Sequence, residues 1–395
     1  MITFPPKTKQ ILLLKGKRLA MQYREFGKTG YKISALGFGA MRLPEKEING
    51  KKVFDHEESI RVIRRGIDLG INYIDSAYGY CNYESETIVG KALKDGYRKK
   101  VKISTKFPTW SAKRPEDFEK CLDEQLKKLD TDKIDFYHFH SLNEKNWNEI
   151  VMKFNLINRA FKAKEEGKID HLSFSFHDNP DVLKTIIDSG FFESMLVQYN
   201  ILYRSNEEMI AYAALKGLGV AIMGTIGGGR LGENSEAIMK MAPDFVHSTP
   251  ELALRFVLSN PNVHCALSGM NAIKMVDEIV ATASSDRTLT IDELETINHI
   301  SKIYKEKSDL NCTYCKYCMP CPNGVNIPLN FHFYNYYQIY ELKNFAREQY
   351  LLIGKLPWYE GKCASECIEC GECEPKCPQK IPIIKQLKET HKILK

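Results

Sequence analysis

The clearest chemistry in this sequence lies in two runs of cysteine near its C-terminal end. The chain contains 12 cysteines among 395 residues. The first run is Cys312, Cys315, Cys318 and Cys321, and the second is Cys367, Cys370, Cys373 and Cys377. A cubane iron–sulfur cluster needs four converging thiolates, one for each iron, and two-residue spacings wrap the backbone around it. The two runs therefore predict two [4Fe–4S] clusters.

The second run matches the bacterial ferredoxin ligand pattern in full, and in that pattern the fourth cysteine ligates the other cluster. On this basis one cluster is held by Cys312, Cys315, Cys318 and Cys377, and the other by Cys321, Cys367, Cys370 and Cys373. In the first run two residues separate Cys318 from Cys321, whereas three separate the last two cysteines of the ferredoxin pattern. The assignment of Cys321 to the other cluster therefore rests on a weaker match. Cys363 is a spare thiol or an alternative ligand. Two all-cysteine zinc sites are the alternative to the clusters.

Four further residues with reactive side chains lie at or just after the ends of strand-like segments earlier in the chain: Asp75, Tyr80, Lys106 and His140. A tyrosine with its ordinary pKa of about 10 is a poor acid at neutral pH. A lysine ammonium beside it lowers that pKa, and an aspartate can hold the lysine in place and charged. A histidine can orient a carbonyl oxygen or help to relay the proton. The set predicts an acid that protonates a carbonyl as hydride arrives, and we interpret His138, on the same strand face, as structural.

The elements that must position these groups alternate between strands and helices. Apolar runs predict eight strands, at residues 33–41, 71–77, 101–107, 133–140, 171–177, 194–200, 219–225 and 263–270. Apolar residues three and four apart predict intervening helices, among them 58–69, 84–94, 115–129, 150–166 and 248–258. Eight strand-then-helix units are what a (β/α)8 barrel requires, with its active site at the C-terminal strand ends. An open doubly wound sheet is disfavoured, because Gly37 and Gly39 lack the third glycine of a dinucleotide-binding turn.

Length and composition predict two domains. The 395 residues exceed the roughly 250–300 that one core usually serves. The predicted fold class is α/β: a (β/α)8 TIM barrel at 21–290 after an N-terminal extension at 1–20, then a smaller helical, two-cluster ferredoxin-like domain at 291–395. A net charge of +6, spread along the chain, gives no nucleic-acid footprint, and no apolar stretch reaches the ~18 residues of a membrane span. The clustered cysteines indicate metal ligation in a reducing, cytoplasmic setting.

The barrel motifs resemble those of the aldo-keto reductase family. The matching residues are Tyr73, Asp75-Ser76-Ala77, Tyr80, Ser85-Glu86, Val89-Gly90, Ala92-Leu93, Ser104-Thr105-Lys106 and the run 134–140, and the resemblance covers about residues 21–285. It implies a catalytic tetrad of Asp75, Tyr80, Lys106 and His140, with Tyr80 as general acid. One subgroup that the chain resembles carries a fused C-terminal iron–sulfur module, which matches the cysteine-rich tail.

The same resemblance implies a nicotinamide nucleotide, NAD(P)H, across the barrel mouth. The implied contacts come from Met41, Ser175, Gln198, Met223, Gly227, Gly228, Gly229, Lys274 and Glu278. Several positions depart from the family pattern: Phe176 replaces an asparagine, Met223 replaces a stacking aromatic residue, and Met275 and Ile279 replace residues that grip the adenosine end. Because the arginine that reads the 2′-phosphate is missing, tight binding of NADPH is not expected.

Three functions remain open at this level. The first is a reductase that acts on a small carbonyl substrate, while the clusters carry electrons to or from a ferredoxin or another redox protein. The second keeps the enzyme but gives the clusters a structural role. The third is an electron-transfer or redox-sensing protein with a catalytically weak barrel. A hydride carries two electrons and a cluster passes one at a time. The first function therefore needs a cofactor that converts the two-electron step into one-electron steps. A flavin could serve, but no flavin signature is visible.

Overall fold

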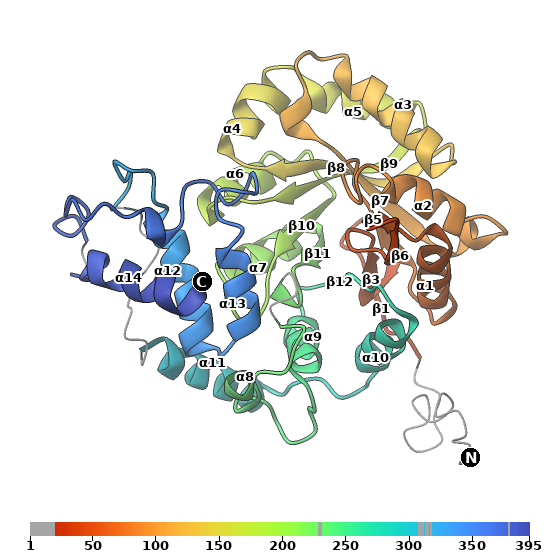
Figure 1. The fold of residues 1–395 in the computed structure, drawn as a ribbon. Coiled ribbons are helices and arrows are strands. Elements are labelled where there is room, and N and C mark those ends of the chain that lie inside the picture. The colour runs from red at the N-terminus through yellow and green to blue at the C-terminus, as the bar shows by residue number, and fades with distance from the viewer. Residues whose placement is uncertain (1–19, 228–230, 307–311, 313–315, 317, 378–379) are drawn as a thin grey trace. The chain divides into compact units, whose positions relative to one another are not determined.

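The computed structural model describes residues 20–395 except 228–230, 307–311, 313–315, 317 and 378–379. The chain forms two compact units (Figure 1). The first comprises Met1–Gly227 and Ala253–Leu289, and the second comprises Gly228–Leu252 and Thr290–Lys395. The segment Gly228–Leu252 lies within the barrel domain predicted at 21–290, but in the structure it groups with the C-terminal part of the chain.

A closed parallel barrel forms the first unit, as predicted. In chain order its strands are β3 (Leu36–Gly39), β6 (Tyr73–Asp75), β7 (Lys102–Phe107), β8 (Ile134–Leu142), β9 (Ile169–Phe176), β10 (Ser194–Gln198), β11 (Gly219–Met223) and β12 (Cys265–Ser268). Each strand pairs with its neighbour in the chain, and β12 closes on β3. All eight C-terminal strand ends therefore meet at one mouth, where barrel enzymes carry their chemistry.

A β-hairpin precedes the barrel, formed by β1 (Tyr23–Glu25) and β2 (Lys32–Ser34). Its apolar residues Phe26 and Ile33 are fully buried with Tyr73 and Phe136 in the barrel core. The predicted strand at 33–41 is therefore wrong in extent: it divides at Ala35 into a hairpin strand and the first barrel strand. An exposed second hairpin, β4 (Glu45–Ile48) and β5 (Lys51–Phe54), follows β3.

Helices alternate with the barrel strands. They are α1 (His56–Asp68), α2 (Ser85–Ala92), α3 (Asp117–Leu129), α4 (Glu144–Asn146), α5 (Leu156–Glu165), α6 (Pro180–Asp188), α7 (Glu207–Lys216), α9 (Thr249–Ser259) and α10 (Ile273–Ala283). The predicted helix at 150–166 is interrupted: a π-helical turn at Trp147–Met152 ends before α5, and Asn155 between them is left-handed at φ 54°. Asparagine tolerates that conformation better than most residues.

Helices dominate the second unit: α8 (Glu236–Met239), α11 (Ile291–Glu306), α12 (Ile327–Ile339), α13 (Lys343–Tyr350) and α14 (Ile383–Leu394). The segment 329–352, which is rich in Phe and Tyr and is predicted to be helical, divides at Glu341, which has a φ of 53°, into α12 and α13. Phe331, Phe333 and Tyr350 are buried there, as expected for core packing. Within the described ranges, no helix combines the length and the apolar character that crossing a membrane requires.

Candidate functional site

Strands β6 and β7 bring a carboxylate and an ammonium together at the barrel mouth. The Lys106 Nζ lies 2.7 Å from the Asp75 Oδ2 and also donates to the backbone carbonyl of Ser76, at 2.5 Å. Ser104 Oγ donates to the other Asp75 oxygen at 2.8 Å. Lys106 is fully buried and Asp75 nearly so. The ion pair is thus held in one arrangement, away from water.

Tyr80 lies beside this pair, on the loop that follows β6. The Lys106 Nζ is 4.8 Å from the centroid of the Tyr80 ring. Burial raises the pKa of Tyr80, the Lys106 ammonium opposes that shift, and Asp75 adds to it, so the pKa stays above its ordinary value. Burial lowers the pKa of Lys106, but Asp75 and Tyr80 raise it more. Near neutral pH the phenol is therefore protonated and the lysine is charged.

His140 at the end of β8 completes the group. Its ring centroid is 5.9 Å from that of Tyr80 and 4.9 Å from that of Trp110, a residue that is 55% exposed. Burial and the Lys106 charge hold the pKa of His140 well below 6.5. His138 lies deeper, and burial lowers its pKa to about 3. Both imidazoles are neutral, so His140 can offer one N–H to a carbonyl oxygen.

The loop after Tyr80 has an unusual backbone. Cys81, Asn82 and Tyr83 are three successive non-glycine residues in the left-handed region, with φ of 51°, 51° and 70°. Each costs roughly 1–2 kcal/mol, and backbone strain of this kind gathers at functional sites. The buried Ser85 Oγ donates to the Ala40 carbonyl at 2.8 Å. The loop is thereby fixed to the segment that follows β3.

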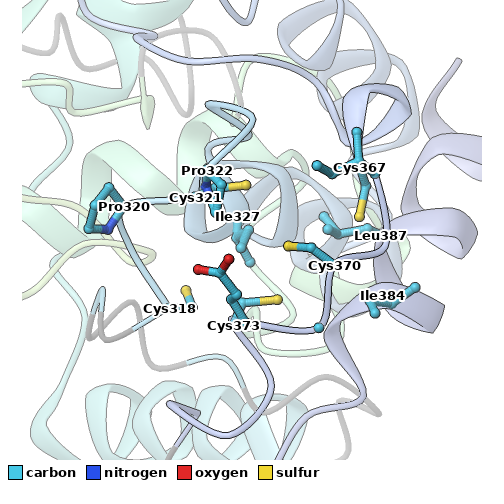
Figure 2. A pocket seen from close by; sticks show the side chains of 13 residues that line it. Cys318, Pro320, Cys321, Pro322, Ile327, Cys367, Cys370, Cys373, Ile384 and Leu387 are labelled. Carbon is cyan, nitrogen blue, oxygen red and sulfur yellow. The ribbon is translucent and has the colours of Figure 1, made fainter.

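In the second unit, five cysteines line one pocket: Cys318, Cys321, Cys367, Cys370 and Cys373 (Figure 2). Cys321 lies here with three cysteines of the second run, and Cys318, which the exchanged pattern assigns to the other cluster, lines the same pocket. Apolar residues of α12 and α14, including Ile327 and Leu387, line the same pocket. Thiols converging on an apolar wall are the donor set that a [4Fe–4S] cluster takes.

The other predicted cluster ligands are only partly described. Cys312 and Cys377 are half-buried and do not line this pocket, and Cys315 lies outside the described residues. Cys363 donates its thiol to the Tyr350 carbonyl at 3.4 Å and is not among the pocket residues. No group of three or more His, Cys, Asp or Glu in the described part of the chain is spaced to hold a single metal ion.

Comparison with known proteins places the barrel in a family. Residues 35–302 match the model of the Aldo/keto reductase family. The chain belongs to this family. Residues 311–381 match the model of the 4Fe-4S dicluster domain, which implies iron–sulfur clusters rather than zinc in this part of the chain. The chain is an oxidoreductase of the aldo/keto reductase type with a C-terminal iron–sulfur domain.

Individual relatives cover the barrel part. L-galactose dehydrogenase of Arabidopsis thaliana is 26% identical over 317 residues, which is 73% of this chain and 96% of that protein. The holo form of the aldo-keto reductase AKR11C1 from Bacillus halodurans is 26% identical with a TM-score of 0.61, over 71% of this chain and 96% of that one. An aldo-keto reductase of Klebsiella pneumoniae in complex with NADPH shares the fold at 22% identity and a TM-score of 0.60, over 71% and 95% of the two chains.

Two predicted nucleotide contacts of this reductase lie on inward strand ends with hydrogen-bonding capacity to spare. Ser175 Oγ accepts a hydrogen bond from the Ser141 amide at 2.7 Å, which leaves its own hydrogen to donate. The half-buried Gln198 pairs in register with Met223, and its side-chain amide has no hydrogen-bond partner among the described residues. Met41, 52% exposed, lies beyond the end of β3. These residues fit a carboxamide-bearing ring at the mouth.

The predicted contacts to the phosphates are less complete. Gly227 is left-handed at φ 58°, and Gly228 and Gly229 lie outside the described residues. Lys274 and Glu278 form an ion pair of 3.7 Å along α10, and both side chains are exposed. The ammonium of Lys274 is therefore partly neutralised within its own helix.

A buried polar network behind the tetrad has no counterpart in the sequence predictions. Gln125 of α3 donates to the Lys106 carbonyl at 3.1 Å and to Glu86 Oε1 at 2.5 Å. Thr105 also donates to Glu86 Oε1, at 2.6 Å, and Tyr137 donates to Gln125 at 2.7 Å. The network joins α2, β7 and β8, the elements that follow Tyr80 or carry Lys106 and His140. It therefore stabilises the backbone that positions the tetrad.

Proposed function

We propose that the barrel reduces a small carbonyl compound to the alcohol, with NAD(P)H as hydride donor and Tyr80 as proton donor, and that in the reverse oxidation NAD(P)+ accepts the hydride and the tyrosinate accepts the proton. One observation carries the proposal: a fully buried Lys106 ammonium lies between the Asp75 carboxylate, at 2.7 Å, and the Tyr80 ring, at 4.8 Å. A buried charge is costly unless it is paired. Its presence beside a phenol is explained if the phenol must become an anion.

Each residue of the tetrad then has one task. The reduced nucleotide supplies a hydride, with its electron pair, to the carbonyl carbon. Tyr80 gives its proton to the carbonyl oxygen, while a neutral His140 donates an N–H to that oxygen and orients it. The Lys106 ammonium stabilises the tyrosinate, and Asp75 keeps Lys106 charged and in place. Tyr80 regains a proton from solvent after the alcohol forms.

Met41, Ser175, Gln198 and Met223 are the proposed contacts to the nicotinamide, and the glycine loop with Lys274 and Glu278 the proposed contacts to the rest of the nucleotide. The free amide of Gln198 and the spare hydrogen of Ser175 support the first assignment. No splitting group such as a flavin is needed for hydride transfer to the carbonyl.

We further propose that the C-terminal domain holds two [4Fe–4S] clusters that carry single electrons. One cluster takes Cys321, Cys367, Cys370 and Cys373, which share a pocket with Cys318. The other takes Cys312, Cys315, Cys318 and Cys377. Cys370 is exposed, so the edge of the first cluster lies near the surface, where a ferredoxin or a similar carrier can approach it.

Tyr80→Phe tests the barrel chemistry. Anaerobically purified protein should oxidise NADH or NADPH when an aldehyde is added, and the variant should lose at least about a hundredfold in kcat, the usual worth of a positioned proton donor. Tyr78→Phe is the matched control, because Tyr78 lies two residues away and hydrogen bonds to Glu124 at 3.1 Å. Undiminished turnover in Tyr80→Phe would remove the assignment.

Iron quantitation and EPR of the anaerobic protein test the clusters, before and after addition of NAD(P)H. About eight irons per chain and two interacting signals are expected for two clusters. Cys370→Ser should abolish electron transfer to an added ferredoxin while carbonyl turnover and melting temperature persist. Global unfolding of that variant, with no ferredoxin-linked activity in the wild type, would instead favour structural clusters.

A further inference from the structure

Arg42 is an exposed arginine on the segment after β3, close to the tetrad. Two residues before it, the Ala40 amide donates to the Asp75 carbonyl at 2.8 Å, and the Ala40 carbonyl accepts from Ser85. The Met41 carbonyl meets the thiol of Cys81, the residue next to Tyr80, at 3.6 Å. The backbone that leads to Arg42 is therefore fixed to both sides of the reacting tyrosine.

The side chain of Arg42 lies over the loop that follows the eighth barrel strand. A β-carbon built on Gly269, just after β12, would be 3.6 Å from the Cβ of Arg42 and 4.0 Å from its Cδ. Barrel enzymes often bind phosphate with the loops after their seventh and eighth strands, which here are β11 and β12. The aliphatic part of the Arg42 side chain thus lies at the part of the mouth where phosphates are commonly bound.

Two cations on or against α10 are already paired. Lys274 in the first turn of α10 pairs with Glu278, and Arg65 pairs with Asp277 at 2.7 Å. Arg42 has no ion pair or hydrogen bond from its side chain to any described residue. An arginine side chain can donate two parallel hydrogen bonds to phosphate oxygens. The apolar side chains of Met275 and Ile279 in α10 can donate none.

We propose that Arg42 binds a phosphate oxyanion of the nicotinamide nucleotide, in place of the arginine missing from α10. This inference rests on the proposed function only in taking a nicotinamide nucleotide as the ligand. It extends the phosphate contacts to a residue that the family motifs do not indicate. Charge and fork geometry both contribute, so lysine should replace arginine only in part.

Direct titration of the anaerobic holoprotein with NADPH and NADH, followed by nucleotide fluorescence, tests the proposal without turnover. Arg42→Met should raise the Kd on the order of ten- to a hundredfold, as expected for charge-assisted hydrogen bonds, and Arg42→Lys should give an intermediate value. Arg61→Met is the control, because Arg61 is an exposed arginine of α1 that pairs with Glu58. It removes the same charge and should leave the Kd within twofold.

The pattern of losses identifies the phosphate. Weaker binding of NADPH alone assigns Arg42 to the 2′-phosphate, and equal weakening of NADPH and NADH assigns it to the pyrophosphate. Unchanged Kd values in Arg42→Met, or a wild-type protein that binds neither nucleotide, would overturn the proposal. So would unchanged nucleotide binding with a raised KM for an aldehyde carboxylate but not for a neutral aldehyde, which would make the substrate the anion. The proposed role of Tyr80 is tested independently, by the turnover of Tyr80→Phe, so the two proposals can fail separately.

Discussion

Lys106→Met removes the buried ammonium while keeping a side chain of similar length. In the native protein burial raises the pKa of Tyr80 and the ammonium opposes that rise. Without Lys106 the pKa of Tyr80 should rise further. Alcohol oxidation needs the tyrosinate, so its rate at a fixed pH should fall and its alkaline rise should move to higher pH. Carbonyl reduction should slow as well, because the tyrosinate forms as the proton leaves.

The size of the effect follows from the geometry. With the charge 4.8 Å from the ring centroid and an effective dielectric constant of about 20, the Coulomb energy between ammonium and tyrosinate is about 3.5 kcal/mol. At about 1.4 kcal/mol for each factor of ten, this corresponds to a loss of roughly 300-fold in kcat. Because Tyr80 is only partly buried, water screens the pair and that figure is an upper bound.

Folding must be separated from catalysis in this test. Lys106→Met leaves the buried Asp75 without its 2.7 Å partner, and breaking such a pair costs roughly 3–5 kcal/mol of stability. The double variant Asp75→Asn/Lys106→Met removes both charges and should recover the melting temperature but not the activity. Lys100→Met, at an exposed lysine near β7, controls for charge loss. A folded double variant that reduces aldehyde at the wild-type rate would refute the reasoning.

Three further predictions concern single residues. Burial raises the pKa of Glu86 above 4.5, so the native state keeps a proton that the unfolded chain releases; stability should fall as pH rises above 4.5, and urea unfolding of Glu86→Gln should lose that slope. His140 is neutral because its pKa lies well below 6.5; kcat/KM for reduction should be flat from about pH 6 to 8, and His140→Gln, which keeps an N–H donor, should retain more activity than His140→Ala. Cys321→Ser should lower the iron content of the anaerobic protein, whereas Cys363→Ser, whose thiol lies outside the pocket residues, should leave it unchanged.

The barrel and its chemical groups were predictable because each depends on local order in the chain. Strand alternation places Asp75 and Lys106 at neighbouring strand ends, and a closed barrel then brings them within hydrogen-bond reach. Boundaries were less predictable. The run at 33–41 is apolar apart from Ser34, and only the pairing of Ile33 with Arg24 across the hairpin divides it at Ala35.

The network behind the tetrad could not be predicted from one sequence. Glu86, Thr105 and Gln125 come from three elements, and nothing in their sequence spacing indicates that they contact one another. Their burial depends on how α2 and α3 pack against β7, which periodicity does not specify. A glutamate on the inner face of α2, where apolar residues are expected, is the one local signal, since buried carboxyls need partners.

The tetrad also constrains how the two redox parts can communicate. In the proposed mechanism Tyr80 delivers its proton in the same event as a hydride, so a one-electron donor has no step to serve at the carbonyl carbon. The clusters should therefore exchange electrons with a one-electron partner protein, and not with the substrate. We expect NADPH-dependent aldehyde reduction to have the same kcat, within twofold, whether the clusters are oxidised or reduced by dithionite that is then removed. Aldehyde reduction by reduced protein without any nucleotide would contradict this, because it would require electrons to reach the substrate one at a time.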